Sequence, residues 1–395
     1  MNAPERTALD FPPTEEAAWN RVRAADPGAY ARRRNHVDGP VTRLSPYLTH
    51  GLIDLPDAVH ALRLRHRPSA LAKLEFEFAW REYFHHVWRH AGDGILADLR
   101  PSVGAGVYSP RLPADLLEAR TGVRVIDESV RTLYRAGYLH NHQRMWLASY
   151  VVHLRKVHWR AGADWMVGHL LDGDLASNHL SWQWVAGTFS RKPYLFNNAN
   201  VARYAPALSS PGTAVDTDYG TLDRIARSAS VAGPEADTPA AGCAPPPLLE
   251  RPPGPPAGSP LPATAGKTVA LLHPWSLRRP AGADLTIGLV HLPFHRRFPW
   301  SEKRWTFVME RLRSICDALW IGDGAALLER LDTADSVAMR VTRNPGYKEL
   351  CAAGGVRSEP VPRLLADPDP LCASFSRFWA RVGHTPRLDG GSHGA

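Results

Sequence analysis

The sequence predicts two folded units of different class, an all-α unit over residues 1–204 and a small, Rossmann-like α/β unit over residues 267–395. The first half of the chain has apolar residues at helical spacing and no strand-like alternation. The last third alternates short apolar runs with helical patterns, which is typical of a parallel sheet. Residues 205–266, between the two, are rich in proline, alanine and glycine and are interpreted as a linker.

The helical unit is predicted from segments with a helical period. In "LAKLEFEFAWREYFHHVWRHAG" apolar residues recur at Leu74, Phe78 and Ala79 and again at Val87 and Trp88, before a closing glycine. "GVRVIDESVRTLYRAG" repeats the spacing, and "HNHQRMWLASYVVHLRKVHW" and "ADWMVGHLLDGDLASNHLSWQW" continue it. Four or more amphipathic helices must pack together to bury these faces.

The linker and the α/β unit follow from composition and alternation. Eleven prolines between Pro234 and Pro262, with few large apolar residues among them, indicate an extended chain without a core. After it, "KTVALLHP", "LTIGLVHLPF", "ALWIGD" and "DSVAMRV" are predicted as strands, and "SEKRWTFVMERLRSICD" and "GAALLERLD" as helices. Neither GxGxxG nor GxxxxGK[ST] occurs there, so no motif supports a dinucleotide or P-loop site in this unit.

Charge and composition limit the function classes. The 395 residues include 47 Lys and Arg against 39 Asp and Glu, a formal net charge of +8, which favours a polyanionic partner such as nucleic acid. No apolar run reaches the ~18 residues of a membrane span, and the first residues do not form a secretory signal. The four cysteines are too widely spaced for a disulfide framework or a structural zinc site. We therefore expect a cytoplasmic protein that needs neither membrane nor metal.

Two predicted helices each gather side chains of different chemistry on one face. These faces carry Glu77, Trp80 and Arg81, and Asn141, Arg144 and Met145, each set at i, i+3 and i+4. The same spacing also describes ordinary amphipathic helices that bury the apolar residue and leave the charges in water. Near the N-terminus, Thr42 and Ser45 stand at the start of a helix, where they form either a seat for a phosphate or a plain helix cap.

The stretch "DGDLASNHLSWQW" is unusually rich in polar and indole side chains. Asp172 and Asp174 flank a glycine, which suits a helix cap, whereas a metal site would need a third donor that the spacing does not supply. Asn178 and Trp182 follow at four-residue intervals on one helix face. Trp184 points to a different face, and core packing is the simplest account of either indole.

In combination these stretches resemble a known family. "TRLSPYL", "EFEFAWREYF", "LHNHQRM", "DGDLASNHLSWQW" and the later "FN" occur in this order, and the set is similar to the FAD-binding helical domain of the DNA photolyase and cryptochrome family. The resemblance runs from about Tyr30 to Asn198. The α/β domain that usually precedes this domain is missing, and residues 267–395 are either its counterpart displaced to the C-terminus or an unrelated α/β module.

The resemblance implies an FAD site. In it, Tyr30, Thr42, Leu44 and Ser45 hold the phosphates, with Arg81 close by. Asp172 and Asp174 border the flavin and ribose, and Arg144 pairs with Asp172. Asn178 faces the central ring nitrogen of the isoalloxazine, where a neutral amide favours the fully reduced anion.

The resemblance also implies a pocket for a pyrimidine dimer that is flipped out of the duplex. Glu77, Trp80, Asn141, Met145 and Trp184 match this pocket, with the indoles as stacking walls. The family branch that repairs (6-4) photoproducts has histidines where this chain has Asn141 and Met145. The cyclobutane dimer branch is therefore the better match.

An electron route to the flavin is implied by two tryptophans. Trp182 and Trp159 match members of the tryptophan chain that re-reduces the flavin. The third member is expected near residues 106–108, where Tyr108 is the nearest aromatic residue. The hole left by photoreduction would then either stay on Trp159 and recombine, or leave by Tyr108, whose oxidation requires loss of the phenolic proton to a nearby acceptor.

The expected function is therefore light-driven DNA repair by a deoxyribodipyrimidine photolyase, a carbon–carbon lyase that acts as a monomer on DNA with cyclobutane pyrimidine dimers. The alternative is a cryptochrome-like blue-light photosensor, which would keep the flavin pocket but would not need Glu77, Met145 and Trp184 together. A third interpretation is a helical DNA-binding protein with a vestigial pocket.

Overall fold

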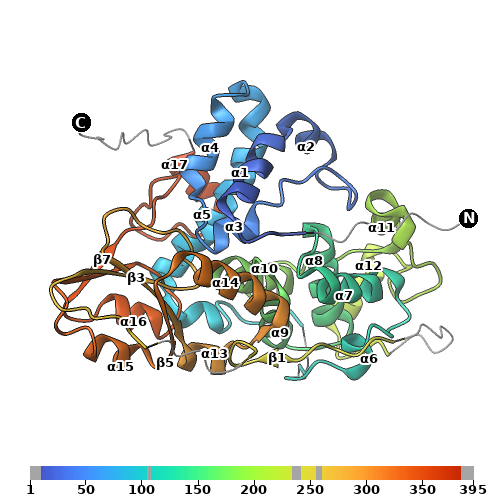
Figure 1. Ribbon diagram of the computed structural model, residues 1–395. Coiled ribbons are helices and arrows are strands. Elements are labelled where there is room, and N and C mark those ends of the chain that lie inside the picture. The colour runs from blue at the N-terminus through green and yellow to red at the C-terminus, as the bar shows by residue number, and fades with distance from the viewer. Residues whose placement is uncertain (1–9, 105, 107, 234–241, 255–259, 384–395) are drawn as a thin grey trace, which may run out of the picture.

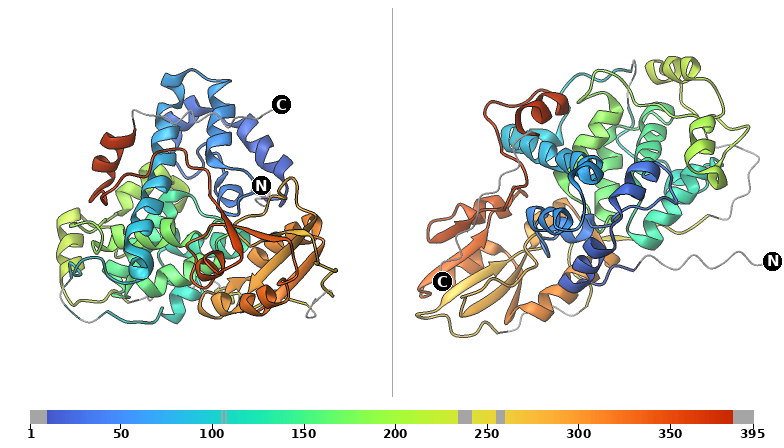
Figure 2. Two further views of the ribbon diagram at one scale, coloured as in Figure 1. Left: turned by 90° about the vertical axis from the view of Figure 1, so that its left-hand side faces the viewer. Right: turned by 90° about the horizontal axis from the view of Figure 1, so that it is seen from above.

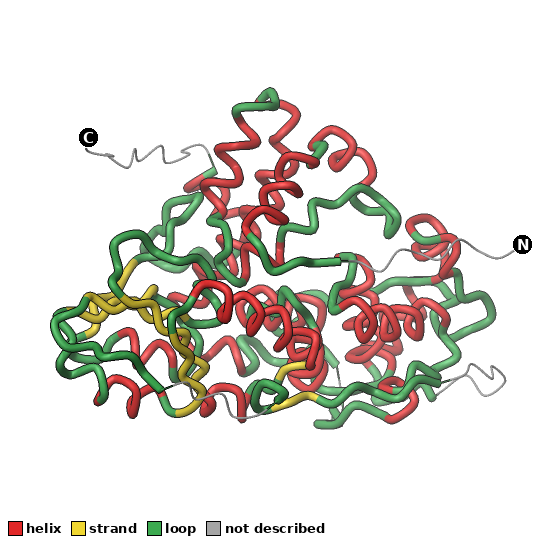
Figure 3. Tube along the Cα trace, in the orientation of Figure 1, coloured by secondary structure: helices red, strands yellow, loops and turns green. Residues whose placement is uncertain are grey.

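The computed structural model describes residues 10–104, 106, 108–233, 242–254 and 260–383, and it contains a helical unit and a five-stranded parallel sheet flanked by helices (Figures 1 and 3). The predicted fold class is confirmed. No helix in these described ranges combines the length and the apolar character that a membrane span requires.

Capping side chains and glycines with positive φ mark several ends of the helices in the first unit. Asp26 and Asp174 cap α2 and α10 through their side chains, and Gly137 and Gly187 end α7 and α10 with φ of 61° and 83°. The elements are α1 (Glu15–Ala24), α2 (Pro27–Arg33), α3 (Ser45–Thr49), α4 (Leu55–Arg63), α5 (Pro68–Ala91), η1 (Gly92–Leu96), α6 (Ala114–Leu117), α7 (Arg124–Ala136), α8 (Asn141–Ser149), η2 (Tyr150–Leu154), α9 (Trp159–His169), α10 (Leu175–Ala186), α11 (Asn198–Tyr204), η3 (Pro206–Leu208) and α12 (Tyr219–Arg227).

The sheet of the second unit has the strand order β5-β3-β2-β6-β7, with every neighbouring pair parallel. Val269 in the central strand pairs with Leu285 on one side and Val337 on the other. Its elements are β2 (Thr268–Leu272), β3 (Leu285–His291), α13 (Leu292–Arg297), α14 (Glu302–Ile315), β5 (Ala318–Gly322), α15 (Gly324–Glu329), β6 (Ser336–Arg340), α16 (Tyr347–Cys351), β7 (Val356–Glu359) and α17 (Phe375–Val382). The four predicted strands and two predicted helices are all present.

The predicted linker over residues 205–266 needs correction. Its first part forms α12, and Leu222 and Ala226 in this helix have no exposed surface. Its later part contains β1 (Leu248–Leu249), which pairs antiparallel with β4 (Trp300–Ser301). The amphipathic spacing in α12 was hidden by the surrounding proline and glycine, so the composition placed the boundary at residue 204 too early.

The apolar interior does not follow the two sequence units. One cluster joins the helices up to η1 and parts of α9 and α10 to the whole α/β unit, and the other lies within residues 116–222. His50 shows this sharing, because its ring nitrogens lie 2.8 Å from the Leu171 carbonyl and 2.5 Å from the Pro274 carbonyl. The C-terminal segment leaves the sheet and runs back to α5 (Figures 1 and 2). The α/β unit is therefore part of the support of the helical unit.

Candidate functional site

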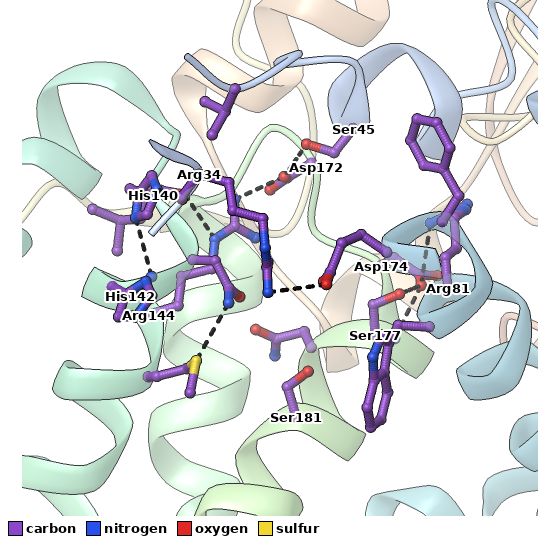
Figure 4. A pocket seen from close by; sticks show the side chains of 18 of the residues that line it. Arg34, Ser45, Arg81, His140, His142, Arg144, Asp172, Asp174, Ser177 and Ser181 are labelled. Atoms are coloured by element: carbon purple, nitrogen blue, oxygen red, sulfur yellow. Dashed lines mark hydrogen bonds and ion pairs between the residues drawn. The ribbon is translucent and has the colours of Figure 1, made fainter. Parts of the chain in front are cut away.

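A cavity of about 630 Å³ lies between α2, α5, α8 and α10 (Figure 4). Fourteen of the sixteen side chains predicted from the sequence line it. They are Tyr30, Thr42, Ser45, Glu77, Trp80, Arg81, Asn141, Arg144, Met145, Asp172, Asp174, Asn178, Trp182 and Trp184. The residues proposed for the cofactor and those proposed for the lesion therefore share one cavity.

Asp172 is the centre of one polar group in this cavity. Its Oδ2 accepts hydrogen bonds from Ser45 Oγ at 2.6 Å and from Arg144 Nη2 at 2.8 Å (Figure 4). Its Oδ1 is buried and has no hydrogen-bond partner among the described residues. A buried carboxylate oxygen without a donor is costly, so this atom fits an N–H or O–H group of a ligand.

Asp174 caps α10 and gathers a second polar group. Its Oδ2 accepts hydrogen bonds from the backbone N–H and hydroxyl of Ser177, at 3.0 and 2.5 Å, and faces His85 Nε2 at 3.1 Å and Arg81 Nη1 at 3.5 Å. Burial alone would raise the pKa of Asp174. The charges of His85 and Arg81 and the hydrogen bonds outweigh burial and hold this pKa well below its usual range.

A side chain from the α/β unit binds the turn between Asp172 and Asp174. Arg304 of α14 is buried and donates to the carbonyls of Val167 and Gly173 at 2.8 and 2.7 Å. Its guanidinium lies 3.8 Å from the centre of the Trp300 ring. A Cβ on Gly173 would lie 2.4 Å from Arg304 Nη1, so the close approach requires glycine.

Asn178 and Trp182 lie one turn apart on α10. The Asn178 side-chain amide donates to the Ala163 carbonyl at 2.9 Å, and nothing in the described part of the chain donates to its Oδ1. Trp182 packs directly on α9, where a Cβ at Gly162 would come within 2.3 Å of the indole. The amide oxygen of Asn178 is thus free to accept from a ligand.

The side chains matched to the lesion pocket are held from several elements. Glu77 pairs with Arg34 at 3.0 Å and with Lys73 at 2.8 Å. The Asn141 amide donates to Met145 Sδ at 3.3 Å. Two cations therefore orient the Glu77 carboxylate as an acceptor at the cavity wall.

Two predicted site residues do not line the cavity. Leu44, predicted to bind the cofactor, is buried in the core, and its backbone precedes α3 as the N-cap residue. Trp159, predicted for electron transfer, is buried behind the cavity, and its indole N–H donates to Asp98 Oδ1 at 2.5 Å. The hydroxyl of Tyr108 is buried and finds no hydrogen-bond partner within the described ranges.

The cavity also contains side chains that sequence reasoning missed. With Arg34, Arg43 and Lys73, it is lined by five cations and three carboxylates, an excess that suits a dianionic ligand. His140 and His142 line it as well, and burial lowers the pKa of each to about 4. Two of these cations had a signal in the sequence, because Arg43 lies inside the quoted stretch "TRLSPYL" and Lys73 lies one helical turn before Glu77.

Part of the chain is similar in sequence to known proteins. Residues 74–216 match the family model described as the FAD binding domain of DNA photolyase. The deoxyribodipyrimidine photo-lyase of Streptomyces griseus is 36% identical over 151 residues, which are 37% of this chain and 32% of that protein. That of Escherichia coli K12 is 32% identical over 208 residues, 48% of this chain and 43% of that protein. The chain thus spans less than half the length of either relative.

Among solved structures, a bacterial class III photolyase from Agrobacterium tumefaciens has a TM-score of 0.45 and 24% sequence identity over 54% of each chain. A cryptochrome from Synechocystis has a TM-score of 0.46 and 23% identity over 57% of this chain and 47% of that one.

Proposed function

We propose that this chain, whose residues 74–216 form an FAD-binding domain of the DNA photolyase family, repairs cyclobutane pyrimidine dimers in DNA with the energy of light. The observation that carries the proposal is the single cavity that is lined both by Ser45, Arg144 and Asp172 and by Glu77, Trp80, Met145 and Trp184. A flavin and a flipped dimer held there would be in contact. The names of the relatives favour repair over a photosensor that lacks repair activity.

The residues present fit FAD. The volume of about 630 Å³ lies within the range of cofactor pockets. The excess of cations matches the two negative charges of a pyrophosphate. Asp172 Oδ1 and Asn178 Oδ1 offer acceptors for N–H or O–H groups of the cofactor.

Reduced FAD, when bound, supplies the electron that light transfers to the dimer. The side chains of the protein bind the cofactor and the dimer and orient them. Asn178 would accept from the cofactor through Oδ1, and Arg144 keeps Asp172 in place to hold it. Trp80 and Trp184 stack on the pyrimidines, and Glu77 accepts from their edge. The photon provides the activation energy, so positioning is the main task of these side chains.

Trp182 and Trp159 are proposed as electron donors from the protein interior. Trp159 is the better terminal donor, because Asp98 lies 2.5 Å from its indole nitrogen and can take the proton that an oxidised indole releases. The unpartnered hydroxyl of Tyr108 has no such acceptor among the described residues. The monomeric state, the cytoplasmic location and the independence from metal stay predictions.

The test is repair of an oligonucleotide that contains one thymine dimer. The purified protein, reduced chemically under anaerobic conditions, should restore the two thymines under blue light and not in the dark. Chromatography of the digested oligonucleotide measures the product. Stoichiometric FAD without light-dependent repair would contradict the proposal and favour the photosensor.

A further inference from the structure

The chain that follows the sheet is fastened along α5. Arg363 pairs with Glu82 at 2.9 Å, and Asp367 Oδ1 lies 2.7 Å from His86 Nδ1. The backbone N–H of Cys372 donates to His86 Nε2 at 2.9 Å. We call residues 363–382 the C-terminal strap, because these contacts tie it to the helix that carries Glu77, Trp80 and Arg81.

The strap ends in α17, which places an aromatic ring on a wall of the cavity. The rings of Phe375 and Trp80 are stacked, with centroids 3.9 Å apart and planes 8° from parallel. Phe375 also meets the edge of Phe76 at 5.0 Å and is itself buried. Trp80 is partly exposed and lines the cavity, so Phe375 covers one face of its indole while another part stays accessible.

We propose that Phe375 is a positioning residue for dimer recognition, acting through Trp80. This inference rests on the proposed function, because it assumes that Trp80 stacks on a pyrimidine. An indole side chain has two rotatable bonds, and a base can use its surface only in one orientation. The stacked ring of Phe375 selects that orientation before DNA arrives, which removes an ordering cost from binding.

The strap offers a matched control. Trp379 lies one turn further along α17 and packs against Phe76 at 5.4 Å, and no ring contact between Trp379 and Trp80 is found in the described structure. The Trp379 ring also stacks on that of Phe375, with centroids 6.3 Å apart and planes 14° from parallel. Its replacement therefore disturbs the same helix and the same interface, while the ring of Phe375 that covers Trp80 is kept. The Phe375→Leu variant keeps an apolar side chain at the buried position and removes only the flat ring.

The experiment measures binding of a duplex with one thymine dimer, relative to the undamaged duplex, together with FAD content, thermal midpoint and light-driven turnover. We expect Phe375→Leu and Phe375→Ala to weaken dimer binding by about three- to tenfold, the range of one aromatic pair. FAD content and turnover at saturating DNA should not change. Trp379→Ala should bind as the wild type does. In a Trp80→Ala background, Phe375→Leu should have no further effect.

The outcomes separate this inference from the proposed function. If Trp80→Ala weakens dimer binding but Phe375→Leu does not, the positioning role is wrong and the proposed function stands. An equal loss in Phe375→Leu and Trp379→Ala would also overturn the inference, because it would indicate general packing. If Trp80→Ala itself binds dimers normally, the lesion pocket is wrong, and the role of Phe375 falls with it.

Discussion

Replacing Arg144 with methionine should weaken FAD binding by more than the loss in folding stability alone predicts. The Asp172 side chain is 3% exposed and that of Arg144 is 26% exposed, so the carboxylate is the partner that cannot reach water. In Arg144→Met this carboxylate keeps, among the described residues, only the hydrogen bond from the Ser45 hydroxyl. Removing one partner of a buried pair costs about 3–5 kcal/mol. Asp172→Asn leaves the more exposed guanidinium and should cost about 1.5–3 kcal/mol, the value of one charged hydrogen bond.

A control for this prediction exists in the same unit. Arg155 pairs with Asp115 at 2.7 Å, with side chains 7% and 13% exposed, and neither lines the cavity. Arg155→Met should therefore destabilise the apoprotein about as much as Arg144→Met does, by urea unfolding. Titration of each apoprotein with FAD should then show at least a tenfold higher dissociation constant for Arg144→Met alone. Equal FAD affinity in the two variants would refute the assignment of Asp172 and Arg144 to the cofactor site.

Three further predictions concern the support of the cavity and the electron route to it. Arg304→Met should lower FAD retention at least tenfold, because Arg304 then no longer holds the turn between Asp172 and Asp174. Arg311→Met on the same helix should reduce the free energy of unfolding only. FAD content after gel filtration measures retention, and equal retention in the two variants would contradict this role of Arg304. Burial lowers the pKa of His140 to about 4, so its stabilising contribution is complete above pH 6.5 and decreases as the pH falls toward 4, by about 2 kcal/mol at pH 5. His140→Asn retains a capping side chain and should lose less free energy of unfolding than the wild type between pH 7 and pH 5. An unchanged dependence on pH would contradict this role of His140. Trp182→Phe should suppress flavin photoreduction in transient absorption yet preserve repair by chemically reduced protein, and unimpaired photoreduction would show another route.

The helices and strands were predictable because apolar periodicity reports which face is buried. The sequence therefore located α5, α7 and the strands of the sheet. It could not show that one core joins the early helices to the sheet, because periodicity marks a buried face without naming what covers it. The assignment of α12 to a linker had another cause, because the surrounding proline and glycine hid its amphipathic spacing.

The site was predictable where residues one helical turn apart share a face, as Asn178 and Trp182 do. Most of the remaining residues were predicted from the family resemblance, and the structure places them along the same cavity. Leu44 and Trp159 were assigned by resemblance alone, and the structure places both side chains outside the cavity wall. Arg304 and Phe375 lie more than a hundred residues from the groups they support, so only the packing of the second unit on the first reveals them.

If the cavity holds the flavin and the flipped dimer together, the two are in contact. The emission lifetime of the reduced flavin reports this contact, because electron transfer to an adjacent dimer shortens that lifetime. Duplex DNA with one thymine dimer should shorten the lifetime, and the same duplex without damage should not. A lifetime that both duplexes leave unchanged, at concentrations where the damaged duplex is bound, would contradict this contact.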